Sequence, residues 1–332
     1  MGVPEQLGNY RIFELIAEGG MASVYRARHP DSHDKDLALK VVHAEVAADP
    51  RLQAMFLTEA RVALVLSHAH VVQTFDVSRH EDGVLLAMEH VDGLDLARLV
   101  HTYAGRYGDA LPLRHVLLIV ADALSGLDYA HRCRGADGAP LGLVHRDVSP
   151  SNLLISTAGE VKVADFGVAA SSLRQHPSLD GALKGKIAYM APEQLRAQPT
   201  DARTDVYAMG VVLYELLTGR RPYAGTGVAI IPDVMAGQFP RPRELNPDVP
   251  EAFESVALCA MATAADVRYV SAAAMGRALH DAAASVRLVP SQLELGGIVE
   301  TLRSDARASI PPAGPGPGPT LAGPAAKRRR GE

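Results

Sequence analysis

The loop at residues 145–152, which reads HRDVSPSN, constrains this chain more than any other segment. It holds Asp147 and Asn152 five positions apart, and a second carboxylate, Asp165, follows soon afterwards as the first residue of a DFG tripeptide. Phosphoryl transfer requires such a set of groups. One carboxylate orients the incoming hydroxyl, while an amide oxygen and another carboxylate hold magnesium against a triphosphate. The pattern therefore predicts a site for phosphoryl transfer.

The order HRDxxxxN and then DFG resembles the catalytic loop and metal-binding turn of the eukaryotic-type serine/threonine protein kinases of bacteria. Further elements of that family follow in the expected order, so the resemblance covers roughly residues 10–284. It implies an α+β, two-lobed protein-kinase fold. A small β-rich N-lobe with one main helix would span residues 10–91, and a larger helical C-lobe residues 92–284, after an N-terminal extension at residues 1–9.

Hydrophobic periodicity supports this division into two lobes. The Asp49-Pro50 pair is a helix start signal, a side-chain cap followed by proline in the first turn, and it predicts the N-lobe helix. The expected strands are Tyr10–Glu18, Ala22–Arg28, Leu37–His43, Val71–Arg79 and Val84–Met88, and the expected later helices are Leu113–Arg132, Thr204–Thr218, Glu251–Ala262 and Val270–Ala284.

The end of the sequence differs in composition from the rest. Residues 285–309 are expected to form a helical extension, whereas the basic, Pro/Gly-rich tail at residues 310–332 cannot build a core and is expected to be disordered. With 48% hydrophobic and 21% charged residues, the whole is typical of a globular protein. A net charge of −5 gives no reason to expect a nucleic-acid partner. With no secretory signal and no integral membrane segment, a cytoplasmic protein is expected.

An ATP site between the lobes is implied by the resemblance. The stretch at residues 17–24 occupies the place of the glycine-rich loop, although Ala17 and Ala22 replace two of its glycines, and an ordinary hairpin is the alternative. Met88 would be the gatekeeper, with backbone groups of Glu89 and Val91 at the adenine edge. The residues expected to bind the nucleotide are Ile16, Ala17, Glu18, Gly19, Gly20, Met21, Ala22, Ser23, Val24, Ala38, Lys40, Met88, Glu89 and Val91.

The resemblance also implies the catalytic roles. Asp147 would orient the substrate hydroxyl, and Lys40, paired with Glu59, would hold the α- and β-phosphates. Asn152 and Asp165 would bind Mg²⁺, with Mn²⁺ as an alternative metal. The residues expected to be catalytic are Lys40, Glu59, Asp147, Ser149, Asn152 and Lys186.

Ser149 and Lys186 depart from the family pattern. The family has lysine two residues after the catalytic aspartate and threonine in the segment before APE, and here Ser149 and Lys186 stand at those positions, as if exchanged. We expect Lys186 to reach across and restore a positive charge near the γ-phosphate, with Ser149 as its hydrogen-bond partner. The alternative is that Lys186 points to solvent and Ser149 has no such role.

The sequence thus predicts a kinase that transfers the γ-phosphate of ATP to Ser/Thr hydroxyls of proteins, itself included, in preference to tyrosine. Serines 171, 172 and 178 are the candidate autophosphorylation sites. A pseudokinase scaffold is one alternative, and a small-molecule phosphotransferase is another. Two structural contacts are also expected: Glu193 of APE with Arg268, and Asp205 with the catalytic loop.

Overall fold

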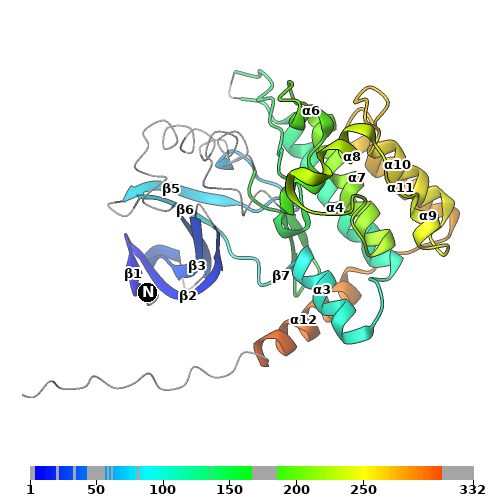
Figure 1. The fold of residues 1–332 in the computed structure, drawn as a ribbon. Helices are drawn as coiled ribbons and strands as arrows, with labels where there is room; N and C mark the ends of the chain where they lie inside the picture. The colour runs from blue at the N-terminus through cyan, green and yellow to red at the C-terminus, as the bar shows by residue number, and fades with distance from the viewer. Residues whose placement is uncertain are drawn as a thin grey trace, which may run out of the picture.

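The computed structural model describes residues 4–19, 22–32, 35–42, 57, 60, 63–80, 83–135, 137–166 and 185–308. Two lobes are apparent in Figure 1, with the strands β1 to β6 gathered in one and the helices α4 to α11 in the other. The predicted α+β, two-lobed architecture is therefore confirmed.

The small lobe is built on a six-stranded antiparallel sheet in the order β1-β2-β3-β4-β6-β5. Alternating side chains of the sheet bury one apolar face, where Ile12, Leu39 and Leu85 share a core. Its strands are β1 (Gln6–Leu7), β2 (Tyr10–Glu18), β3 (Ala22–Arg28), β4 (Leu37–Val42), β5 (Thr74–His80) and β6 (Gly83–Glu89), with a short 3₁₀ helix η1 at Pro30–Ser32.

The helix expected after Asp49-Pro50 falls outside the described residues, apart from Leu57, Ala60 and residues 63–66. Of these, Ala60 is fully buried against Val42 and Leu86 of the sheet. Glu59, the expected partner of Lys40, also lies outside the described residues.

The large lobe contains a small second sheet and most of the helices. The sheet pairs β7 (Gly93–Asp95), β8 (Leu153–Ser156) and β9 (Val161–Val163). The helices are α3 (Leu96–Tyr107), α4 (Leu113–Arg132), η2 (Pro150–Asn152), η5 (Ile187–Tyr189), α6 (Pro192–Leu195), α7 (Ala202–Thr218), η6 (Gly227–Ile230), α8 (Ile231–Ala236), α9 (Pro242–Leu245), α10 (Glu251–Ala260), α11 (Ala272–Ser285) and α12 (Gln292–Ala308).

Helix α7 forms the centre of this lobe because it is apolar nearly all round. Almost every residue from Thr204 to Leu217 is buried, and the helix packs against α4, α10 and α11. Asp201 caps its first turn through the Arg203 N–H, and Gly219 ends it in the left-handed conformation. A rigid central helix is a suitable anchor for loops at its N-terminal end.

Helix α12 lies within the region expected to be a helical extension. It packs against α3, α4, β7 and β8, and Figure 1 places it beneath β7 and beside α3. Its side chains Leu295, Val299 and Leu302 are fully buried in the core of the large lobe. Among the helices of the described ranges, none is long and apolar enough to cross a membrane.

Candidate active site

The loop that carries Asp147 is fixed by a buried carboxylate at the start of α7. Asp205 accepts hydrogen bonds from the backbone N–H groups of His145 and Arg146, both at 2.8 Å, and lies 2.7 Å from Nε2 of His131. These contacts hold Arg146 in the left-handed region, at φ 64°. Burial is the largest single influence and opposes ionisation of Asp205, but the hydrogen bonds and charges of His131 and His145 together outweigh it and lower its pKa. The expected contact of Asp205 with the catalytic loop is confirmed.

Asp147 and Asn152 face each other across this loop. The Asn152 Nδ2 group donates to the backbone carbonyl of Asp147 at 2.7 Å and to its carboxylate at 3.0 Å. The 3₁₀ turn η2, which begins with Pro150, brings the amide back over the aspartate. The spacing of five residues therefore works as a closed loop in which the amide sets the direction of the carboxylate.

Asp165 is delivered to the same place by the β8–β9 hairpin. The hairpin starts directly after Asn152 and ends just before Asp165, and the Ala164 N–H donates to the Asn152 carbonyl at 2.9 Å. Asp165 itself takes a left-handed backbone conformation, with φ 59°. The two side chains predicted to bind metal are thus fixed at one end of one hairpin.

Lys40 reaches this cluster from the other lobe. Its Nζ lies 2.6 Å from Oδ1 of Asp165, so the ammonium from β4 joins the two lobes at the site. Burial is the largest single influence and opposes ionisation of Asp165, yet the charge and hydrogen bond of Lys40, together with the charges of Lys186 and His145, hold its pKa below the ordinary value. Asp165 is therefore a carboxylate at neutral pH.

The donor set suits a divalent cation. In the described part of the chain, Oδ1 of Asn152 and Oδ2 of Asp165 have no hydrogen-bond partner, because each residue uses its other polar atom within the protein. Carboxylate and amide oxygens are the ligands that magnesium and manganese prefer. The two residues could therefore hold such an ion.

Lys186 supplies a second ammonium at the cluster. Its Nζ lies 2.5 Å from Oδ2 of Asp147, so it does not point to solvent. The neighbouring 3₁₀ helix η5 fixes its backbone, because all three residues of η5 are buried and Tyr189 donates a hydrogen bond to Glu215.

One detail of the predicted exchange is wrong. Ser149 was expected to bond Lys186, but the Ser149 hydroxyl lies 3.1 Å from that of Ser151, and Lys186 pairs with Asp147 instead. A serine side chain is too short to compete with a carboxylate for the ammonium, and a neighbouring hydroxyl lies within its reach. Ser149 therefore lies within the catalytic loop without touching the cation.

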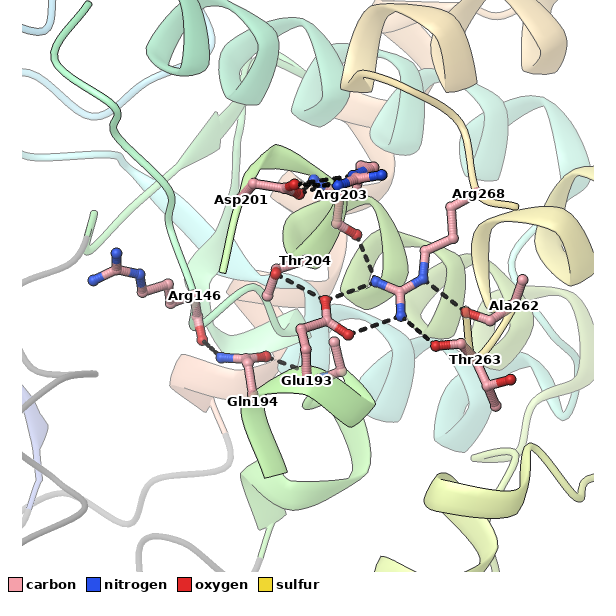
Figure 2. Close-up of polar contacts among 10 residues, drawn as sticks. Arg146, Glu193, Gln194, Asp201, Arg203, Thr204, Ala262, Thr263 and Arg268 are labelled. Carbon is pink, nitrogen blue, oxygen red and sulfur yellow. Dashed lines mark hydrogen bonds and ion pairs between the residues drawn. The ribbon is translucent and has the colours of Figure 1, made fainter. Parts of the chain in front are cut away.

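The segment after Lys186 is clamped to the large lobe by a buried ion pair, drawn in Figure 2. Arg268 forms a bidentate pair with Glu193, at 2.8 and 2.9 Å, and its side chain is fully buried. Its remaining donors reach the carbonyls of Ala262, Thr263 and Arg203. Burial is the largest single influence and raises the pKa of Glu193, but the hydrogen bonds from Arg268, Thr204 and the backbone, with the Arg268 charge, together outweigh it and the net pKa is lowered. The expected Glu193–Arg268 pair is confirmed.

Gln194 links this segment to the catalytic loop, a contact that sequence reasoning missed. Its side chain donates to the Arg146 carbonyl at 2.9 Å and accepts from the Ala191 N–H at 3.0 Å. The two loops that carry Lys186 and Asp147 are thereby joined at a point other than the ion pair. The only sequence signal was its place directly after APE.

Comparison with known proteins gives the same assignment as the geometry. A family model described as "Protein kinase domain" matches residues 10–256. The chain belongs to the protein kinase family. The predicted family is therefore confirmed, and the clustered residues Asp147, Asn152 and Asp165 belong to the HRDxxxxN and DFG motifs of that family.

Two bacterial protein kinases are similar to this chain over most of its length. "Tyrosine-protein kinase MasK" of Myxococcus xanthus is 38% identical over 275 residues, which is 82% of this chain and 42% of the relative. "Serine/threonine-protein kinase PknB" of Mycolicibacterium smegmatis is 37% identical over 287 residues, 83% of this chain and 43% of the relative. The chain thus spans less than half the length of these two relatives.

The fold of the kinase is similar to that of a solved bacterial kinase domain. The crystal structure of the Mycobacterium tuberculosis PknI kinase domain superposes with a TM-score of 0.66 at 28% identity. That likeness covers 85% of this chain and all of the PknI chain. The two-lobed protein-kinase fold is thereby confirmed.

The strands at the expected nucleotide site of the kinase lie side by side. Ile16, Ala17 and Glu18 end β2, while Ala22, Ser23 and Val24 begin β3, and the Gly19 N–H donates to the Ala22 carbonyl at 3.0 Å. Val24 pairs with Lys40, and Ala38 pairs with Met88. Gly20 and Met21, at the tip of the loop, lie outside the described residues, as do serines 171, 172 and 178.

The hinge of the kinase presents a backbone donor. Among the described residues the Val91 N–H has no hydrogen-bond partner, as an adenine-binding group requires. The Glu89 carboxylate pairs with Lys162 of β9, at 3.0 Å, and accepts from the Gln73 N–H at 3.3 Å. The Glu89 side chain therefore braces the hinge. Sequence reasoning missed this Lys162 contact because it depends on the packing of two distant strands.

Proposed function

We propose that this chain is a serine/threonine protein kinase that transfers the γ-phosphate of Mg-ATP to protein hydroxyls, its own included. The observation that carries the proposal is the convergence of two ammonium groups on two carboxylates beside an amide, with Lys40 on Asp165 and Lys186 on Asp147. Electrostatic stabilisation and positioning supply most of the catalysis in phosphoryl transfer, and this cluster has the groups for both.

Each residue has one part in this proposal. Asp147, directed by Asn152, accepts the proton of the substrate hydroxyl or orients it. Asn152 and Asp165 hold the divalent ion, which neutralises phosphate charge when bound. Lys40 holds the α- and β-phosphates, with Glu59 as its proposed second partner.

Lys186 has the part that the family gives to a lysine of the catalytic loop. Because it lies on the carboxylate of Asp147, its charge is next to the position that an attacking hydroxyl would take. We assign it the stabilisation of charge that develops on the transferred phosphoryl group.

Protein substrates and Ser/Thr specificity are the more specific part of the proposal. The Glu193–Arg268 clamp organises the segment that binds peptides in this family, which favours a protein over a small molecule. Pro150 keeps the loop ending typical of Ser/Thr kinases. One relative is named a tyrosine kinase and another a serine/threonine kinase, so the target hydroxyl needs a direct test. We further propose magnesium as the metal and the cytoplasm as the location.

The deciding experiment incubates the purified chain with γ-labelled Mg-ATP and a generic protein substrate, beside Asp147→Asn. We expect label on serine or threonine, in the chain and in the substrate, and almost none with Asp147→Asn. Label confined to tyrosine would overturn the specificity. Nucleotide binding without any transfer would instead establish the pseudokinase scaffold, and the same assay with Mn²⁺ tests the choice of metal.

A further inference from the structure

Three segments that are far apart in the sequence meet beside the hinge. Asp92, directly after the hinge, accepts a hydrogen bond through its carbonyl from the Thr157 N–H at 2.9 Å. Its carboxylate pairs with Arg303 of α12. One residue at the end of the hinge is therefore held both by the β8–β9 turn and by α12.

The β8–β9 turn and α12 touch through their backbones. A Cβ atom on Gly159 of the turn would lie 2.0 Å from the Gln292 carbonyl oxygen, and one on Gly296 of the helix would lie 2.6 Å from the Thr157 carbonyl oxygen. Only glycine allows such an approach, and Gly159 is also in the left-handed conformation, at φ 78°. With no side chain between them, a shift of α12 must displace the turn.

The contact is held on both sides. On the inner side, Leu295, Val299 and Leu302 are fully buried. On the outer side, Glu294 pairs with Arg114 of α4 at 2.7 Å, and this pair is about half exposed. Arg303 itself has a side chain only 17% exposed, and its partner Asp92 is 54% exposed. Helix α12 is thus part of the large lobe, and Arg303 is its inward-facing link to the hinge.

Both contacted segments lead into the proposed nucleotide site. The β8–β9 hairpin connects Asn152 with Asp165, and Asp92 follows the hinge position Val91, whose N–H is available to an adenine edge. The junction is therefore one of the contacts that fix the hinge relative to the metal-binding residues, beside the Glu89–Lys162 pair and the pairing of β7 with β8.

We propose that α12 positions the nucleotide site, with Arg303 as the positioning residue that holds the hinge in register with the β8–β9 hairpin. This inference rests on the proposed function insofar as it takes the hinge and hairpin to bind Mg-ATP. Arg303 touches no nucleotide in this view. It acts through Asp92, and its loss lets the adenine-binding and phosphate-binding halves of the site drift relative to each other.

The test compares Arg303→Met with Arg114→Met in the full chain. Both variants remove one ion pair of α12, but only Arg303 reaches the hinge. We expect Arg303→Met to weaken Mg-ADP binding, measured by titration calorimetry, about fivefold, and to raise the KM for ATP by a similar factor with kcat nearly unchanged. Arg114→Met should leave both values within about twofold of the wild type.

Two further measurements separate positioning from loss of structure. Arg303→Lys, which keeps the charge, should restore most of the affinity, and thermal unfolding shows whether each variant is folded at the temperature of the titration. Unchanged Mg-ADP affinity in folded Arg303→Met overturns the proposal. Equal losses in the Arg303 and Arg114 variants also overturn it, because anchoring of α12 alone would then explain the effect.

Failure of the proposed function gives a different result. A wild-type chain that binds Mg-ADP but phosphorylates nothing contradicts the kinase activity, while the Arg303 proposal is still decided by the binding constants. A wild-type chain that binds no nucleotide overturns both.

Discussion

At the scale of single residues, the catalytic cluster contains Lys186, which pairs with Asp147 from the segment before APE and not from the catalytic loop. Lys186 and Asp147 are separated by 39 positions, yet their charged atoms lie 2.5 Å apart. Asp147 and Lys186 are each partly exposed, with side-chain exposures of 20% and 32%, so a substrate hydroxyl can still approach the carboxylate. The ammonium is held by a loop that packs on the large lobe.

Lys186→Ala should lower kcat by about 100-fold, because it removes the cation nearest to the reacting phosphoryl group. Lys186→Arg, which keeps the charge, is the matched control and should retain much of the activity. The double variant Ser149→Lys with Lys186→Thr moves the lysine to the usual family position and should recover most of the loss. Steady-state phosphorylation of a protein substrate measures all of them, and normal turnover in Lys186→Ala would refute the assignment.

Arg268→Ala should lower the free energy of unfolding by about 3–5 kcal/mol, because it leaves the Glu193 carboxylate buried without its partner. Arg203→Ala is the control. It breaks the half-exposed pair with Asp201 and should cost less than about 1 kcal/mol. Urea denaturation followed by circular dichroism gives both values. Equal losses of unfolding free energy in the two variants would mean that the buried Arg268 pair contributes no more to stability than the half-exposed Arg203 pair.

At the scale of elements, α12 and the β8–β9 hairpin behave as one packed unit. Two adjacent glycines of α12 differ sharply in their surroundings. A Cβ atom on Gly296 would collide with the backbone of the turn, whereas one on Gly297 would meet nothing within 4 Å. The pair is a natural control for the docking of the helix.

Gly297→Ala should raise the free energy of unfolding by about 0.5–1 kcal/mol, since alanine is the better helix former and no neighbour is disturbed. Gly296→Ala should lower it by about 1–3 kcal/mol, because the helix and the turn must separate. Chemical denaturation of the two variants side by side is the measurement. Stabilisation of similar size in both would show that α12 does not dock on the turn.

Elements with a clear pattern were predictable from the sequence, and so were the two contacts that the family motifs imply, Glu193 with Arg268 and Asp205 with the catalytic loop, whereas other contacts between elements were not. The bounds of β2, β3 and α4 agree with the expected ranges, because each has a strong periodicity and a clear end signal. The strand expected from Val71 begins only at Thr74, since Val71 instead forms an isolated bridge with Val163. The motifs indicated Asp147, Asn152 and Asp165. They could not show that Lys186 pairs with Asp147 or that Arg303 pairs with Asp92 after the hinge.

At the scale of the whole molecule, carboxylates with lowered pKa values join separate parts of the structure. Glu193 and Asp205 lie where the segment after Lys186 and the catalytic loop meet α7, and Asp165 lies where the two lobes meet. Burial raises the pKa values of Asp95 and Asp122, so ionisation of these two groups lowers the stability of the folded state. The pH dependence of the free energy of unfolding depends on the sum of these stabilising and destabilising contributions.

Stability should fall as the pH drops below about 4.5, the ordinary value for Glu193. A carboxyl group with a lower pKa in the folded state stabilises the protein fully above its unfolded pKa. That contribution is lost as the pH falls through the folded pKa. Glu193→Gln removes one such group and should make the acid slope shallower, which urea denaturation between pH 3 and pH 7 would detect. An unchanged slope would contradict the lowered pKa of Glu193.

The position of Lys186 also limits which segments of this kinase can be exchanged with those of a relative. Lys186 lies in the segment before APE and Ser149 in the catalytic loop, so the two halves of the exchange are in separate parts of the chain. A chimera that imports that segment from a relative with threonine at this position would lose its cation, and one that imports only the catalytic loop would crowd two ammonium groups onto one carboxylate. Grafts between this chain and such a relative will function only when both segments are moved together.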